Sequence, residues 1–254
     1  MSNMAIIQFV LALIILGLLY KRMISREIPG PISKPQAAVP VVLGVVSVPV
    51  SFLLVLVLAM LLTALGYSKA EAPMVVSSVV GAFFGAGFSE EVTKLAMMAI
   101  TIVIFRSRIR NVYEYILIGA GVGFGFTLLE EFLYGSEGAI AFLRLFDVAA
   151  HMVFGIIMAK HLGIARYNKV TGKGPVSGEY AKAFVIPVLM HTALDAGSAT
   201  NAFLASENDA MVLIGIVTGI GAVIAMFATQ IVVLNRLKKN AEKYSGMVFD
   251  LSDR

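Results

Sequence analysis

The sequence predicts an all-α polytopic membrane protein with about seven transmembrane helices. Of its 254 residues, 59% are hydrophobic and only 14% are charged. The mean hydropathy of +0.89 exceeds what a soluble domain of this size needs to fill its core. Apolar runs of about 20 residues, long enough to cross a hydrocarbon core of about 30 Å, recur along the chain. Basic residues gather in alternate loops between these runs.

We predict seven spans, over residues 4–20, 39–65, 73–105, 112–134, 139–164, 183–199 and 211–234. The first run lacks a preceding basic segment and a small-residue cleavage site, so we expect it to be retained as a span. The third is too long for one straight span. Its glycines, Gly81, Gly85 and Gly87, predict a bend or break before Glu90.

The basic residues predict the orientation. In a seven-span arrangement, 17 of the 20 Lys and Arg fall on one side, in the segments that follow spans one, three, five and seven. The positive-inside rule makes that side cytoplasmic, so the N-terminus is expected outside and the C-terminus inside. The formal charge of +4 therefore follows from topology, and no nucleic-acid partner is expected. We predict a single integral membrane domain over residues 1–254.

Ionisable side chains interrupt four of the apolar runs. A charge at the centre of a span costs about 2.5–3.5 kcal/mol on insertion scales, so such residues indicate a functional site by default. Small residues surround them, which lets helices approach closely and lets their polar side chains meet. The positions are Glu90, Glu91, Lys94, Glu130, Glu131, His151, His191 and Asp195.

Helical spacing predicts which of these side chains interact. Lys94 follows Glu90 by four residues and Glu91 by three, so it can neutralise either carboxylate. Glu90 and Glu91 themselves point about 100° apart around a helix, so only one can face a shared centre. His191 and Asp195 are four residues apart and lie on one helix face.

The residue types limit the chemistry. The chain has no cysteine, which excludes disulfides, cysteine metal sites and thiolate nucleophiles. A carboxylate surrounded by apolar walls can act as a general base for water, and histidines opposite it can stabilise an oxyanion or protonate a leaving amine. His151 and His191 with Glu130 or Glu90 would alternatively form a zinc site with an open water position. No HExxH motif is present, so nothing local requires zinc.

Four motifs occur in order on four spans: SEEVTK at 89–94, GVGFGFTLLEE at 121–131, HMVFGIIMAKHLG at 151–163 and HTALDAG at 191–197. Together they resemble the PrsW family of intramembrane proteases, which belongs to a wider group that includes CAAX prenyl endopeptidases and bacteriocin-processing proteins. The resemblance covers about residues 75–200. The helices at 4–20, 39–65 and 211–234 flank this protease-like core. The resemblance implies a multi-helix fold with an active site within the bilayer of a prokaryotic plasma membrane.

The resemblance implies roles for the first motif. Glu90 or Glu91 is similar to the family's paired glutamate whose carboxylate activates water, and we favour Glu90 as the base with Glu91 as its support. Lys94 occupies the basic position of that motif and would balance the charge of the pair.

The other motifs imply further roles. Glu130 matches the glutamate of the family's second motif. Glu131 stands where the family often has Asn and is assigned a supporting role. His151 resembles the histidine that works with the base. His191 and Asp195 resemble a final motif that contributes an oxyanion site in prenyl-protease relatives. An Asp at that position would have to be protonated to donate, or would orient His191 instead.

We therefore expect an intramembrane endopeptidase of the glutamate type that needs no cofactor, with a zinc-dependent enzyme as the alternative. Its expected partners are a membrane-anchored protein substrate and the lipid bilayer. Two other functions stay open, namely a proton- or cation-coupled transporter or channel that uses the same carboxylates and histidines, and a non-catalytic membrane scaffold. Transporters often contain inverted repeats, and none is evident in this sequence.

Overall fold

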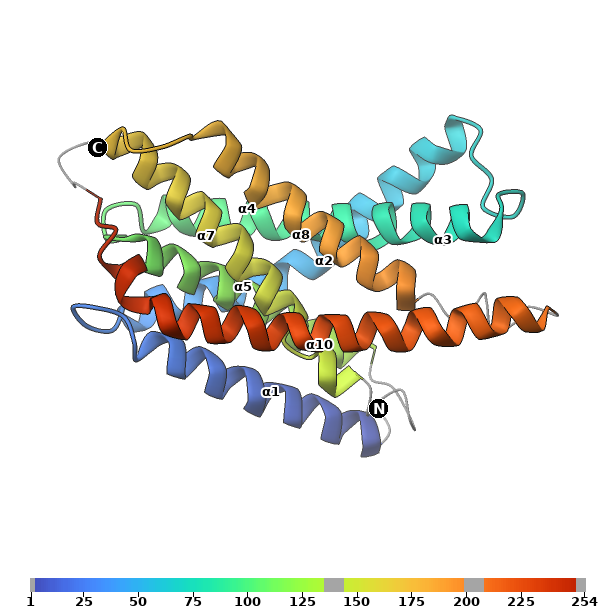
Figure 1. Cartoon of the computed structure of the whole chain (residues 1–254), viewed down its shortest axis with the longest axis horizontal. Coiled ribbons are helices and arrows are strands. Elements are labelled where there is room, and N and C mark those ends of the chain that lie inside the picture. The colour runs from blue at the N-terminus through green and yellow to red at the C-terminus, as the bar shows by residue number, and fades with distance from the viewer. Residues whose placement is uncertain (1–2, 135–143, 199–207, 250–254) are drawn as a thin grey trace.

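The computed structural model describes residues 3–134, 144–198 and 208–249. These residues form α1 (Asn3–Ile24), α2 (Lys34–Ala64), α3 (Met74–Ala82), α4 (Phe88–Ile104), α5 (Val112–Leu133), α7 (Ala150–Thr171), α8 (Ser177–Ser198) and α10 (Asp209–Ser245). A π-helical turn, η1 (Phe83–Gly87), joins α3 to α4. Figure 1 shows the helices as one elongated bundle. The prediction of an all-α fold is confirmed.

Six helical segments of the described chain are long and apolar enough to cross a membrane. They are Asn3–Ile24, Lys34–Ala64, Met74–Ile104, Val112–Leu133, Arg144–Thr171 and Asp209–Ser245. The protein is therefore a polytopic integral membrane protein. α8 corresponds to the predicted sixth span but is not among the six, so the count of seven crossings stays a prediction. The predicted span limits at Ala139 and Ala199 lie outside the described residues.

Several helices extend beyond the predicted spans. α10 continues past Leu234 to Ser245. α7 continues past Ile164 to Thr171, where Gly172 ends it in the left-handed conformation with φ of 68°. α8 begins at Ser177, ahead of its predicted span. Apolar periodicity marks only the part of a helix that faces lipid or core, so these polar extensions are not evident from hydropathy.

The irregularity that the glycines predict before Glu90 is the π-helical turn η1. The helix continues through this turn from Met74 to Ile104 without a break. A π-turn inserts an extra residue and so rotates the side chains that follow relative to those before it. The direction in which Glu90 and Glu91 point therefore depends on η1.

α5 forms the centre of the bundle, and its residues from Val112 to Thr127 are all buried. Its glycines allow backbone contact with neighbouring helices. A Cβ at Gly119 would collide with the backbone of Gly155 on α7, and a Cβ at Gly125 would collide with the backbone of Val41 on α2. The small residues thus bring α2 and α7 close to α5, as the sequence predicts.

The segments that are predicted to be cytoplasmic meet at one end of the bundle, on the left in Figure 1. Arg110 pairs there with Glu27 at 2.9 Å and with Glu114 at 2.6 Å. The Phe249 N–H donates to the Arg110 carbonyl, which joins the C-terminal segment to the loop before α5. This grouping agrees with the positive-inside pattern, while the orientation in the bilayer stays a prediction.

We predict that Gly119→Ala destabilises the fold by about 1–3 kcal/mol, because the added methyl group would overpack the contact between α5 and α7. Thermal or denaturant unfolding in detergent measures the change. The matched control is Gly221→Ala on α10, where an added Cβ meets nothing within 4 Å of it in the described structure. That variant should be neutral or gain up to about 1 kcal/mol from helix propensity. Equal losses at both positions would contradict the packing argument.

Candidate active site

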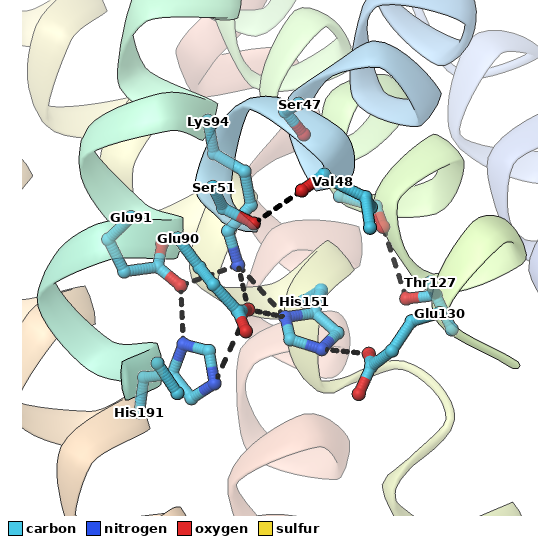
Figure 2. A network of polar contacts seen from close by, with 12 residues as sticks. Ser47, Val48, Ser51, Glu90, Glu91, Lys94, Thr127, Glu130, His151 and His191 are labelled. Carbon is cyan, nitrogen blue, oxygen red and sulfur yellow. Dashed lines mark hydrogen bonds and ion pairs between the residues drawn. The ribbon is translucent and has the colours of Figure 1, made fainter. Parts of the chain in front are cut away.

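The ionisable residues of the four motifs converge between α4, α5, α7 and α8. Figure 2 shows Glu90, Glu91 and Lys94 on one side, with Glu130, His151 and His191 facing them from the other helices. The structure therefore brings together side chains from segments separated by as many as 100 residues. Helix α4 contributes the first three residues, and α5, α7 and α8 contribute one each of the other three.

A fully buried ion pair lies at the centre of this cluster. Lys94 Nζ is 2.6 Å from Glu91 Oε1, and both side chains have no exposed surface. The same ammonium group is 2.9 Å from His151 Nδ1 and 3.8 Å from Glu90 Oε2. It also lies 4.3 Å from the centroid of the Phe126 ring. Lys94 thus pairs with both glutamates, as the helical spacing predicts.

Each active-site histidine is held by a carboxylate. His191 Nδ1 is 2.8 Å from Glu91 Oε1, and His151 Nε2 is 2.5 Å from Glu130 Oε2. In the neutral rings these nitrogens carry the proton and donate to the carboxylates. The other ring nitrogens, His191 Nε2 and His151 Nδ1, then carry lone pairs that do not face these carboxylates. The lone pair of His151 accepts from Lys94.

Glu90 is the glutamate of the first motif that faces a cavity. Its Oε2 atom is buried and has no hydrogen-bond partner among the described residues. This oxygen lies 3.9 Å from His151 Nδ1 and 3.7 Å from His191 Nε2. Glu91 points instead toward Lys94 and His191, so the two neighbouring glutamates have different surroundings.

The cavity in front of Glu90 has a volume of about 800 Å³. One wall is polar and is formed by residues of the cluster, including Glu130, His151, His191 and Asp195. The other wall is one apolar face of α10, made of Ile216, Gly219, Ile220, Val223, Ile224 and Phe227. The cavity can therefore hold water against the carboxylates and apolar side chains against α10.

Local packing explains how His191 reaches the cluster. A Cβ at Gly87 would collide with Thr192 and with the Val188 carbonyl, so α8 lies directly against the backbone at the end of η1. This close approach places His191 beside Glu91. The glycine before the motif thus serves helix packing as well as the π-turn.

The remaining predicted residues lie at the edge of the cluster. Asp195 Oδ2 is 3.7 Å from His191 Nε2, and 36% of its side chain is exposed. Glu131 pairs with Arg144 at 2.8 Å and hydrogen-bonds to Gln8 of α1. Of the two glutamates on α5, Glu130 is the one that contacts a histidine.

Three contributors were missed in the sequence analysis. Arg144 bridges Glu130 at 3.4 Å and Glu131 at 2.8 Å. Gln8 and Gln230 are buried amides on α1 and α10, helices that we predicted only to flank the core. A polar amide inside an apolar span is itself a signal of an interhelical hydrogen bond.

Three of these residues fit a metal ion. One ligand atom each from Glu90, His151 and His191 lies within 4.8 Å of the other two. Two imidazoles and a carboxylate are a common zinc donor set, and zinc-bound histidines usually donate their second N–H to a carboxylate, as both histidines do here. A metal ion would compete for His151 Nδ1 with the Lys94 ammonium group, which already donates a hydrogen bond to that nitrogen.

A family model described as PrsW family intramembrane metalloprotease matches residues 35–229. The chain belongs to the PrsW family. The resemblance that the four motifs indicate is thus confirmed, and the matched region extends beyond those motifs into α2 and α10.

Curated PrsW proteins are similar to part of the chain. Protease PrsW of Bacillus subtilis (strain 168) is 34% identical over 116 residues, which cover 44% of this chain and 51% of that protein. Protease PrsW of Oceanobacillus iheyensis is 31% identical over 118 residues, covering 45% and 53%. That of Shouchella clausii is 29% identical over 123 residues, covering 45% and 52%. The chain therefore spans about half the length of the curated relatives it matches. No solved structure matches it significantly.

We predict that Lys94→Met destabilises the protein by about 3–5 kcal/mol, because it leaves the Glu91 carboxylate buried without its cation. Unfolding in detergent measures the loss. The double variant Lys94→Met/Glu91→Gln should recover part of it, since the uncompensated charge is then absent.

The pair Lys182 and Glu179 offers a matched control for this prediction. Its members are also three residues apart and lie at 2.7 Å, but the Lys182 side chain is 51% exposed. Lys182→Met should therefore cost about 1 kcal/mol or less. Similar losses for Lys94→Met and Lys182→Met would show that burial of the central pair has no special weight.

Proposed function

We propose that this PrsW-family chain is an intramembrane endopeptidase of the glutamate type, which hydrolyses a peptide bond of a membrane-anchored protein. The observation that best supports the proposal is the Glu90 carboxylate. Its Oε2 atom is buried, has no hydrogen-bond partner in the described chain and lies between two histidines at the wall of a cavity. A general base needs an oxygen that can accept a hydrogen bond, and then a proton, from water.

In the proposed reaction, Glu90 accepts a proton from a water molecule in the cavity while the water oxygen attacks the carbonyl carbon of the substrate. His191 in its protonated form donates its Nε2–H to the oxyanion while Glu91 holds Nδ1, and the Asp195 carboxylate, 3.7 Å from Nε2, stabilises the positive charge of that ring. The carbon–nitrogen bond then breaks, and the proton held by Glu90 passes to the leaving nitrogen. The products are a carboxylic acid and an amine, and Glu90 returns to its carboxylate form.

The neighbouring groups position these reactants. Glu91 holds the His191 ring through Nδ1, and Glu130 holds the His151 ring through Nε2. Lys94 balances the charge of Glu91 and Glu90. These contacts fix the rings before substrate binds, which reduces the reorganisation needed during the reaction.

A metal-dependent form of the same site is the alternative, and the description of the matching family favours it. Glu90, His151 and His191 would hold the ion. A zinc ion bound there would polarise the substrate carbonyl and activate water. We propose the metal-free form because the Lys94 ammonium already supplies a positive charge at His151 Nδ1 and near Glu90.

The partners and location follow from the same proposal. The substrate is a protein with a membrane-spanning segment, which reaches the cavity from within the bilayer. The location is the plasma membrane of a prokaryote, which agrees with the Bacillus subtilis origin of one curated relative.

We predict that Glu90→Gln abolishes proteolysis, because the amide cannot accept the proton from water. Mass spectrometry of membrane-protein fragments, comparing cells that express wild type with cells that express the variant, measures the loss and identifies the substrate. The matched control is Glu71→Gln, the same change at an exposed residue outside the cluster, and it should leave the fragments unchanged. If Glu90→Gln produces the same fragments as wild type, the proposal is wrong. Proton flux in liposomes that Glu90→Gln abolishes would instead favour a transporter.

We also predict that the purified, active protein holds no stoichiometric metal and keeps its activity in the presence of a chelator. Elemental analysis together with cleavage of the substrate identified above measures both. One equivalent of zinc that is lost in His191→Ala, with activity abolished by chelation, would establish the metal-dependent form. Lys182→Met serves as the control for metal content, because its side chain lies in the more exposed pair with Glu179.

A further inference from the structure

Gln230 is a buried amide on α10, a helix whose neighbouring residues form the apolar wall of the cavity. Only 5% of its surface is exposed. Its Nε2 donates to the Phe146 carbonyl at 2.9 Å, and its Oε1 accepts from the Ala149 N–H at 3.3 Å. One partner is an acceptor and the other a donor, so a carboxamide satisfies both and its orientation is determined.

These two hydrogen bonds span the turn that precedes α7. Phe146 lies on the helical segment before the turn, and Ala149 is the N-cap residue of α7. Within the described residues, no side chain of this segment itself caps α7. The first N–H groups of a helix need partners, and α10 supplies one of them through Gln230.

The turn separates two residues that hold the same carboxylate. Arg144 lies before the turn, and its Nη2 is 3.4 Å from Glu130 Oε1. His151 lies after the turn, and its Nε2 is 2.5 Å from Glu130 Oε2. The relative placement of Arg144 and His151 on Glu130 therefore depends on the shape of the turn, and Gln230 bridges its two ends.

Apolar packing holds the same part of α10 in place. Met226 belongs to a buried cluster with Ala150, Val153 and Phe154 on α7. The Phe227 ring is 5.3 Å from the Phe146 ring. Such contacts resist separation of the helices but tolerate small sliding movements, whereas a pair of directional hydrogen bonds does not.

We propose that Gln230 is a positioning residue of the active site. Through the turn at 148–149, it holds His151 and Arg144 in their places on Glu130 and links α10 to the polar cluster. Gln230 does not line the cavity, so it acts through α7. The kinetic part of this inference rests on the proposed hydrolase function, while its structural part stands without it.

The test uses Gln230→Leu, Gln230→Glu and the control Thr229→Val. Leucine removes both hydrogen bonds and retains similar bulk. Thr229 is the neighbouring residue, and its hydroxyl donates to Ala225 of its own helix at 2.8 Å. The probe is the full-length membrane protein whose fragment depends on Glu90, with kcat and KM measured in detergent.

We expect Gln230→Leu to lower kcat by about tenfold to a hundredfold, the range typical of a misplaced catalytic group, with KM little changed. Thr229→Val should behave as wild type. Unchanged kcat in Gln230→Leu would overturn the proposal, and so would an equal loss in Thr229→Val.

Gln230→Glu distinguishes positioning from a general stabilising role. A protonated carboxyl group can donate to Phe146 and accept from Ala149, whereas an ionised one can only accept. The kcat of this variant, divided by that of wild type at each pH, should therefore rise as pH falls. A ratio that is independent of pH would overturn the proposal. This comparison uses only Gln230→Glu and wild type, so it also applies if Gln230→Leu fails to fold.

Hydrogen exchange tests the structural part without any substrate. Deuterium uptake in the peptide that covers residues 144–152 should be faster in Gln230→Leu than in wild type and Thr229→Val. If wild type cleaves nothing, the proposed function fails while faster uptake still supports the role of Gln230 in the turn. Equal uptake in all three proteins would overturn that role, whatever the cleavage assay shows.

Discussion

The candidate active site depends on the buried ion pair between Glu91 and Lys94. Neither side chain has any exposed surface, so each charge requires the other. Glu91 also holds His191, and Lys94 also contacts His151. Removal of this pair would therefore leave both histidines without one of their supports. The neighbouring Glu90 keeps a buried oxygen that accepts no hydrogen bond from any described residue, which leaves it able to accept one from water.

The helices reach this arrangement because glycines let their backbones touch. Gly119 and Gly155 join α5 to α7, and Gly87 brings α8 against η1. The dispersion contacts at these crossings replace the hydrophobic driving force, which is weak between helices in lipid. The polar cluster thus relies on close packing that a single methyl group would disturb.

The choice between the proposed metal-free site and a metal site depends on one contact, that of Lys94 with His151. Glu90, His151 and His191 are spaced to hold a metal ion, and the family description names a metalloprotease. Lys94 competes for the same space through its hydrogen bond to His151 Nδ1. The single lone pair of His151 Nδ1 could not serve both the Lys94 ammonium group and a zinc ion, and the two cations would repel each other, which is why we favour water activated by Glu90.

The sequence by itself determined the helical membrane fold, the PrsW family and the ionisable residues of the four motifs. Hydropathy, loop charge and short motifs are local properties, so they can be read without coordinates. Only the tertiary structure decided that Glu90 faces the cavity while Glu91 is enclosed, because this depends on the π-turn and on the approach of α8. It also decided that Gln230 reaches the turn before α7, since that contact joins residues 81 positions apart and nothing local in the sequence identifies the partner of the amide.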